Sequence, residues 1–148
     1  MVNPFDWRAV LLAKHAQHVV LIHFPIALFI TGVAFDFFSQ GKRASYLAAA
    51  AYLNFSVAAA TIFPVLGTGL LAWQFALPGK TLKGLLLWHL MAAAIATGLV
   101  IASWVVHWRM RKSESTLLPA YRIPLELLGV TAIVVAAHLG GFLSGVNL

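Results

Sequence analysis

The chain has 148 residues, of which 61% are hydrophobic and only 9% are charged. Soluble domains carry about 25% charged residues, so this composition argues against a water-soluble fold. The formal net charge of +6 comes from basic residues at predicted helix ends, where they anchor to phospholipid headgroups, and we therefore expect no nucleic-acid partner.

Four apolar runs are long enough to cross a bilayer, which takes about 20 helical residues. They cover residues 17–38, 45–76, 84–108 and 121–144, and charged or turn-forming residues separate them. The runs show neither the polar stripe of a soluble amphipathic helix nor the alternation of a β-barrel strand. The sequence therefore predicts an all-α membrane protein with one domain over residues 1–148, built as four transmembrane helices in an up-down-up-down bundle.

The N-terminal segment mixes apolar and charged side chains over residues 5–16. Such a pattern suits a short helix that lies along the headgroup region, and a plain extension of the first spanning helix fits equally well. The segment lacks the basic start and small-residue cleavage site of a secretory signal, so we expect it to be retained.

Basic residues in the short loops predict the orientation of the bundle. One end of the bundle holds four of them: Arg8, Lys14, Lys80 and Lys83. The other end holds six: Lys42, Arg43, Arg109, Arg111, Lys112 and Arg122. The second end is therefore expected in the cytoplasm, with both termini in the periplasm.

Three of the predicted helices carry a histidine at a similar depth. Counted from the cytoplasmic helix ends, His23, His89 and His138 lie about 22, 28 and 26 Å along their helices. Ionisable residues are costly inside a membrane and tend to mark function, so this layer suits a set of ligands. A hydrogen-bonded packing motif and a chance alignment are the alternatives. Pro25 fits either a first helical turn or a kink that directs His23 into the bundle.

Haem b suits this layer better than zinc. A catalytic zinc site needs a general base, and no acidic residue is expected at this depth. The absence of cysteine excludes the covalent attachment of a c-type haem and thiolate-held iron–sulfur clusters. His23 and His89, on diagonal helices, are the first choice as axial ligands of the haem iron, and His138 is the runner-up or a propionate partner. His138 with His18, which lies about 7 Å nearer the periplasm, is the alternative pair for a second haem.

Two glycine pairs offer room for a flat macrocycle. Gly67 and Gly69 lie in the second predicted helix, and Gly140 and Gly141 follow His138 in the last. Close helix packing through small residues explains them equally well.

The other ionisable residues near the cytoplasmic end receive structural interpretations. We expect Asp36 to pair with Lys42 or Arg43, and Glu126 to stabilise the first turn of the last helix. His107 is interpreted as an interfacial anchor. No nucleophile with a neighbouring base is evident, so we do not expect an enzyme with its own turnover.

The stretch HVVLIHFPIALFITGVAFDFF, residues 18–38, resembles the opening signature of the bacterial membrane proteins grouped as domain of unknown function 2231. The residues that carry this resemblance are His18, the HFPIAL segment from His23 to Leu28, and Asp36. Further matches are TGLLAW from Thr68 to Trp73, His89, and the HLGGFL stretch of the last helix. The chain departs from the family at Ala72, where an acidic residue is frequent, and it lacks a histidine after the last glycine pair.

The resemblance implies a small redox module of the bacterial inner membrane, because similar domains occur joined to Rieske iron–sulfur or c-type cytochrome domains. The expected function is a non-catalytic subunit that holds haem b near the periplasmic face. It would pass electrons between a quinol or another membrane cofactor and a periplasmic cytochrome c or Rieske-type partner, and a quinone is a further candidate cofactor. Two alternatives stay open: a cofactor-free structural subunit of a larger complex, and a small-solute or metal-ion carrier.

Overall fold

The structure is a computed structural model, which describes residues 14–40, 45–76, 79, 81–112 and 119–145. The helices in this part of the chain are α2 (Lys14–Leu21), α3 (His23–Phe38), α4 (Ser45–Ala76), α5 (Gly84–Lys112) and α6 (Arg122–Ser144). They form four spans that are long and apolar enough to cross a membrane, with α2 and α3 making the first. The predicted all-α fold with four transmembrane helices is confirmed. The segment proposed as an interfacial helix lies almost entirely outside the described residues.

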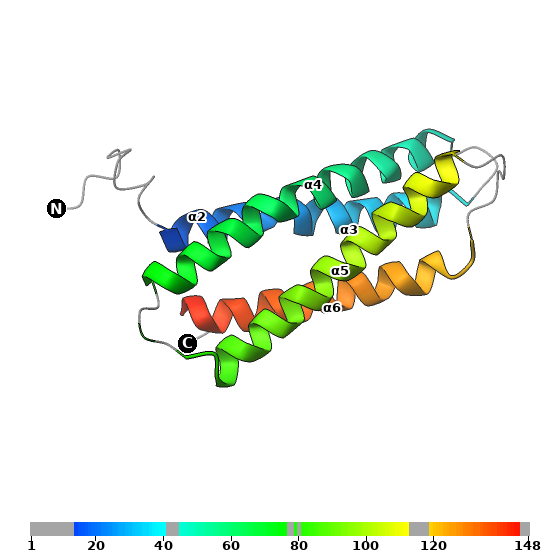
Figure 1. Cartoon of the computed structure of the whole chain (residues 1–148). Helices are drawn as coiled ribbons and strands as arrows, with labels where there is room; N and C mark the ends of the chain where they lie inside the picture. The colour runs from blue at the N-terminus through cyan, green and yellow to red at the C-terminus, as the bar shows by residue number, and fades with distance from the viewer. Residues whose placement is uncertain (1–13, 41–44, 77–78, 80, 113–118, 146–148) are drawn as a thin grey trace.

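The spans run side by side as two hairpins (Figure 1). α3 packs against α4, α5 packs against α6, and α4 joins the two hairpins by packing against α5. The first span therefore lies diagonally opposite α5, as an up-down-up-down bundle requires. The start of α2 and the end of α6 lie at the same end of the bundle, which we call the terminal end (Figure 1). At the opposite end, called the far end, α3 and α5 finish and α4 and α6 begin.

The first span is interrupted at Ile22, between α2 and α3. Pro25 is the cause, because proline has no N–H to donate to the carbonyl of Leu21 and its ring crowds the preceding turn. The chain stays close to helical through the break, since the Ile22 N–H still donates to the His18 carbonyl at 3.0 Å. Pro25 therefore lies in the first turn of α3, one of its two predicted placements, and His23 is the first residue of this helix.

The core lies in the middle of the bundle and extends toward the far end. Phe29 of α3 and Phe55 of α4 are both fully buried, and their ring centroids lie 5.4 Å apart. Gly129 brings α6 close to this pair: a Cβ atom at that position would lie 2.7 Å from Cζ of Phe29. Buried alanines complete the core: Ala51, Ala58 and Ala96. Small residues allow the close van der Waals contact on which helix association in lipid depends.

Large apolar side chains cover the outer faces of the bundle. Leu53, Phe63 and Ile95 are each more than half exposed. In water such a surface would be unfavourable, whereas in a bilayer it faces hydrocarbon. Some polar side chains of the spans pair with each other across helices: the indole N–H of Trp104 donates to Ser56 Oγ across the α4–α5 contact at 3.2 Å.

Candidate functional site

His23 lies at the start of α3 with its side chain exposed from the described chain. Its Nδ1 lies 2.7 Å from the carbonyl oxygen of Val19, one turn earlier in α2. A carbonyl oxygen only accepts hydrogen bonds, so Nδ1 carries the hydrogen and the lone pair of the neutral ring is on Nε2. The ring is therefore held in one tautomer by its own helix.

His89 is half-buried between α5 and α6. Its Nδ1 donates to the carbonyl of Ala136 in α6 at 3.0 Å, which again leaves the lone pair on Nε2. Gly140 makes room for this ring, because a Cβ atom there would lie 3.1 Å from Cε1 of His89. Gly140, the first of the last glycine pair, thus has a packing role on the imidazole of α5.

His18 contacts α4 as His89 contacts α6: its ring forms a hydrogen bond to the neighbouring helix and packs on a glycine there. Its Nδ1 lies 3.3 Å from the hydroxyl of Thr68, and a Cβ atom at Gly69 would lie 3.0 Å from its Cε1. That hydroxyl donates to the carbonyl of Pro64 at 2.9 Å, so it accepts from the imidazole. Each hairpin therefore seats one imidazole against a glycine near the terminal end.

The remaining predicted site residues are less enclosed. His138 is exposed on α6, with its ring edge-on to Phe142 at a centroid distance of 5.0 Å. A Cβ atom at Gly67 would meet nothing within 4 Å, and Gly141 is half-buried. Among the described residues, His23, His89 and His138 do not converge to form a cluster of possible metal ligands.

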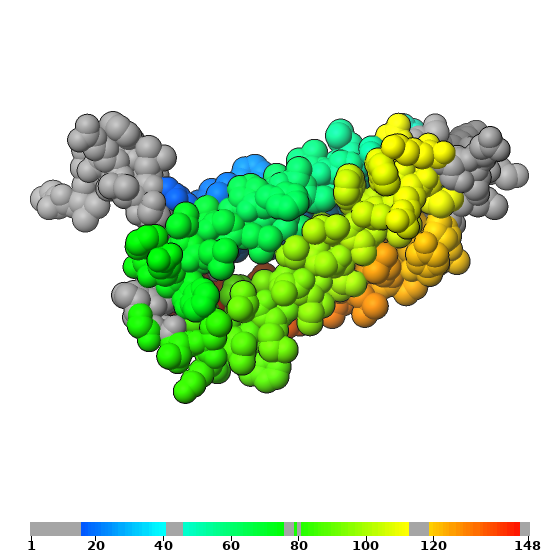
Figure 2. Space-filling model, in the orientation of Figure 1, coloured from blue at the N-terminus to red at the C-terminus, as the bar shows by residue number. Residues whose placement is uncertain are grey.

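The surface at the terminal end is hollowed between α4 and α5 (Figure 2). A groove of about 650 Å³ lies at this end, between the α4–α5 connection and the end of α6. Lys83 and Thr81 line it together with Leu86 and Phe142. Lys83 was one of the basic residues expected at this end, whereas none of the predicted histidines lines the groove.

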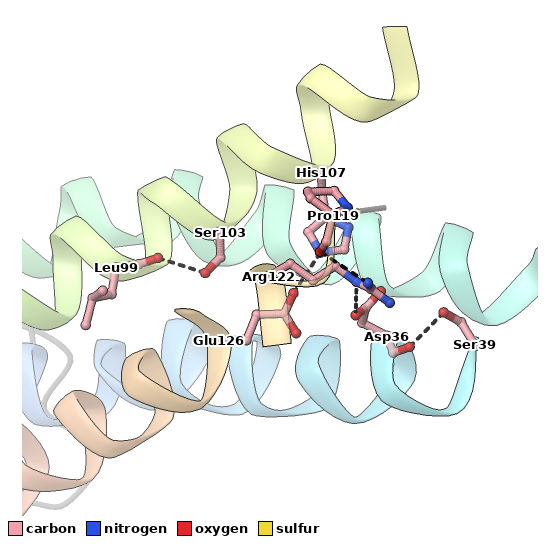
Figure 3. Close-up of polar contacts among 8 residues, drawn as sticks. All are labelled: Asp36, Ser39, Leu99, Ser103, His107, Pro119, Arg122 and Glu126. Atoms are coloured by element: carbon pink, nitrogen blue, oxygen red, sulfur yellow. Dashed lines mark hydrogen bonds and ion pairs between the residues drawn. The ribbon is translucent and has the colours of Figure 1, made fainter. Parts of the chain in front are cut away.

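A second group of ionisable side chains lies buried near the far end, where α3, α5 and α6 meet (Figure 3). Arg122, the first residue of α6, donates through Nε to Oδ2 of Asp36 in α3 at 2.8 Å. It also donates through Nη1 to the carbonyl of Pro119 at 3.4 Å. Asp36 is fully buried and Arg122 is 8% exposed. Arg122 is thus the described partner of Asp36, whereas Lys42 and Arg43, the partners expected from the sequence, lie outside the described residues.

His107 and Glu126 complete this far-end cluster, which we define as Asp36, His107, Arg122 and Glu126. His107 Nε2 lies 2.9 Å from Oε1 of Glu126, and the imidazole packs on the ring of Phe55 at a centroid distance of 4.6 Å. His107 is 4% exposed, so its interpretation as an interfacial anchor is wrong. Glu126 is fully buried and contacts another helix, so stabilising the first turn of its own helix does not account for it.

The far-end cluster has an incomplete set of hydrogen bonds. Within the described part of the chain, two buried carboxylate oxygens lack a partner: Oδ1 of Asp36 and Oε2 of Glu126. One ligand atom from each of Asp36, His107 and Glu126 lies within 4.8 Å of the other two. Leaving a buried acceptor unpaired costs about 1–3 kcal/mol.

The sequence analysis does not predict the far-end cluster, because its predicted end of α5, residue 108, lies four residues before the end in the structure. A helix that stops at residue 108 puts His107 at the membrane surface, whereas α5 continues to Lys112 and buries it. The spacing of Arg122 and Glu126, four residues apart on one helix face, was the available signal.

Comparison with known proteins adds a family but no function. The model of a family described as predicted membrane protein (DUF2231) matches residues 14–146. No curated protein and no solved structure matches the chain. The resemblance inferred from the HFPIAL segment and its companion motifs is confirmed by this match. The chain is a multi-pass membrane protein and belongs to the DUF2231 family of predicted membrane proteins.

Proposed function

We propose that this chain is a membrane electron-transfer subunit that holds non-covalent haem b near its terminal end. One observation carries the proposal: His23 and His89 each donate Nδ1–H to a backbone carbonyl, at 2.7 and 3.0 Å. A histidine that ligates a metal needs a neutral ring, and it usually donates its second N–H to such an acceptor. Both rings therefore have the tautomer that would bind iron through Nε2.

The arrangement of the helices supports this choice of axial pair. Two axial histidines need backbones on opposite sides of a macrocycle, and His23 and His89 lie on diagonal spans. Bound haem b would supply a one-electron carrier. Lys83, in the groove at the same end, is suited to meet a propionate, and His138 remains the second choice as ligand or propionate partner.

A subunit of this kind requires partners for both half-reactions. We propose a quinol or another membrane cofactor on one side and a periplasmic cytochrome c or Rieske-type protein on the other. The terminal end, where Lys83 lines the groove, is the proposed contact for the periplasmic partner. The setting is the bacterial inner membrane, with both termini in the periplasm.

The proposal is tested by absorption spectra of the detergent-purified chain, oxidised and dithionite-reduced, after expression with ample haem. We expect a b-type reduced spectrum in the wild type that is lost in both His23→Ala and His89→Ala. His107→Asn is the matched control, because it removes a histidine from the far end of the same bundle. A folded but colourless wild-type chain would refute haem binding.

The His138→Ala variant separates the ligand pairs. Loss of the spectrum in His138→Ala together with its retention in His23→Ala would show that the alternative pair, His138 with His18, holds the iron. Loss in His23→Ala and His89→Ala with retention in His138→Ala supports the pair proposed here.

One observation favours a second candidate, a cofactor-free structural subunit of a larger complex. The His89 bond to the Ala136 carbonyl joins α5 to α6, so this histidine has a structural role without any ligand. The His23 bond runs from α3 to α2 within the first span, so it joins no two spans. The structural candidate therefore predicts that His89→Ala lowers the melting temperature whereas His23→Ala leaves it unchanged, with or without added haem. Haem ligation predicts a haem-dependent loss of stability in both variants.

A further inference from the structure

We infer that the far-end cluster is a proton-binding site, in which Asp36 and Glu126 share one proton that exchanges with the aqueous phase at that end. The inference does not depend on the haem proposal, which concerns other residues at the other end of the bundle. It rests on the charges of the four side chains, the direction of their hydrogen bonds, and the two buried oxygens without partners.

The charge of the cluster is unbalanced without an added proton. Arg122 contributes one positive charge, and ionised Asp36 and Glu126 contribute two negative charges, which leaves one negative charge if His107 is neutral. These side chains are at most 10% exposed. A net charge that is buried and unpaired is expensive.

The hydrogen bonds of His107 indicate that its ring is neutral. Its Nε2 lies 2.9 Å from Glu126 Oε1 and donates to it. Its Nδ1 has no hydrogen-bond partner among the described residues, and Phe55 covers the ring from α4. A neutral imidazole with its hydrogen on Nε2 makes this bond and keeps a lone pair on Nδ1, so the bond to Glu126 needs no added proton on the ring.

A proton on Glu126 completes the hydrogen bonds of the whole cluster. Oε1 of Glu126 accepts from His107, so Oε2 is the oxygen left to carry the proton. The O–H can then donate to Oδ1 of Asp36, the other oxygen without a partner, while Oδ2 of Asp36 keeps its bond from Arg122. One carboxylate oxygen of each of these two groups lies within 4.8 Å of the other, so the carboxyl groups are close enough for a side-chain rotation or one bridging water to join Oε2 to Oδ1. The cluster then has zero net charge.

A divalent metal ion fits the same place less well. With Arg122 present, a divalent ion would change the net charge of the cluster from one negative to one positive, so the cluster would still be charged. A metal-bound His107 would direct its lone pair at the ion and leave Nδ1–H without the acceptor that ligating histidines normally have. The donor set therefore favours the proton.

The position of the cluster allows exchange with water at the far end. Arg122 opens α6, and Asp36 lies in the last turn of α3, two residues before that helix ends at Phe38. Three basic residues follow His107 on α5, and of these Arg111 lies over the ring of Tyr52 at 4.4 Å and Lys112 over the ring of Trp108 at 4.2 Å. The proton would thus enter from the far end, and the packed core around Phe29 and Phe55 would block its passage to the terminal end.

The experiment uses infrared spectroscopy of the full chain in lipid nanodiscs, with glutamate labelled by ¹³C at the side-chain carboxyl. The sequence has only two glutamates, Glu114 and Glu126, so labelling in a Glu114→Gln background reports Glu126 alone. We expect a protonated carboxylic acid band at neutral pH that shifts with the label and with D₂O. The band should be lost in Glu126→Gln and retained in Ser103→Ala. Ser103 is the matched control because it is buried one turn from His107, and its hydroxyl donates to the Leu99 carbonyl of its own helix.

Two results would overturn the inference. One is the absence of a label-sensitive acid band from the folded wild-type chain at every pH at which it remains folded, and this result needs no variant at Glu126. The other is a divalent metal that copurifies with the wild type in one-to-one ratio by elemental analysis and is lost in Glu126→Gln. The two proposals are tested independently: the absence of the acid band does not bear on the haem spectrum, and the absence of the haem spectrum does not bear on the acid band.

Discussion

Gly129 sets how closely α6 approaches α3, because it faces a ring that has no room to move. A Cβ atom at this position would lie 2.7 Å from Cζ and 2.8 Å from Cε1 of Phe29, and that ring is fully buried. Overpacking of this kind costs about 1–3 kcal/mol. We therefore expect Gly129→Ala to lower the melting temperature of the detergent-solubilised chain, measured by loss of helical circular dichroism.

Gly98→Ala is the matched control for this substitution. Gly98 also lies within a spanning helix, but a Cβ atom there would meet nothing within 4 Å. Alanine is the better helix former by about 1 kcal/mol, so the control should melt at or above the wild-type temperature. A Gly129→Ala chain as stable as Gly98→Ala would mean that α3 and α6 are farther apart than described.

At the scale of single residues, the sequence predicts the depth of a polar group in the membrane better than it predicts the partner of that group. Counting along helices led to the histidine layer, but it says nothing about direction around the helix axis. His89 turns toward α6 and bonds the Ala136 carbonyl, whereas the side chain of His138 is exposed. The Asp36–Arg122 pair joins residues 86 positions apart, and such a contact cannot be read from local spacing.

The break at Ile22 is an element-scale feature with a direct test in Pro25→Ala. Alanine supplies the missing N–H for the Leu21 carbonyl and removes the ring that crowds the turn, so α2 and α3 should merge into one helix. The Ile26 N–H now reaches the Ile22 carbonyl at 3.4 Å, a long bond that should shorten. We expect slower amide hydrogen exchange over residues 22–26, measured by mass spectrometry in nanodiscs.

The α6 peptides serve as the internal reference for this measurement, because the substitution adds no bond there. Unchanged exchange at residues 22–26 would show that the break depends on packing against α4 and not on proline. A continuous helix would also rotate His23 relative to the bundle, so the same variant should weaken haem binding if the proposed axial pair is correct.

The sequence predicts a helix end correctly where polar residues begin at the position at which the helical backbone stops. Both ends of α4 match the predicted range, residues 45–76, because loop segments with charged or turn-forming residues flank it. α5 extends past its predicted end at residue 108 because basic residues are good helix formers at a C-terminus, and their side chains reach the headgroups while the backbone stays helical. Lys112, for example, lies over the ring of Trp108 at 4.2 Å.

The orientation of the whole molecule in the membrane is predicted from the basic residues at its two ends, and the ion pair of Arg122 changes their count. Arg122 is buried in an ion pair with Asp36, so its charge is compensated and should not count toward topology. Five basic residues then remain at the far end, Lys42, Arg43, Arg109, Arg111 and Lys112, against four at the terminal end, Arg8, Lys14, Lys80 and Lys83. This small excess still places the far end in the cytoplasm, and three of the five basic residues that carry it lie at the end of α5.

A C-terminal reporter fusion tests that placement. We expect alkaline phosphatase to be active and green fluorescent protein to stay dark, because only the periplasm activates the first and only the cytoplasm matures the second. Replacing Arg109, Arg111 and Lys112 by alanine lowers the far-end count from five to two, below the four at the terminal end, and should give a mixed or inverted signal. A fluorescent wild-type fusion would place the terminal end in the cytoplasm, and the histidines near it would then face cytoplasmic partners while the far-end cluster exchanged its proton with the periplasm.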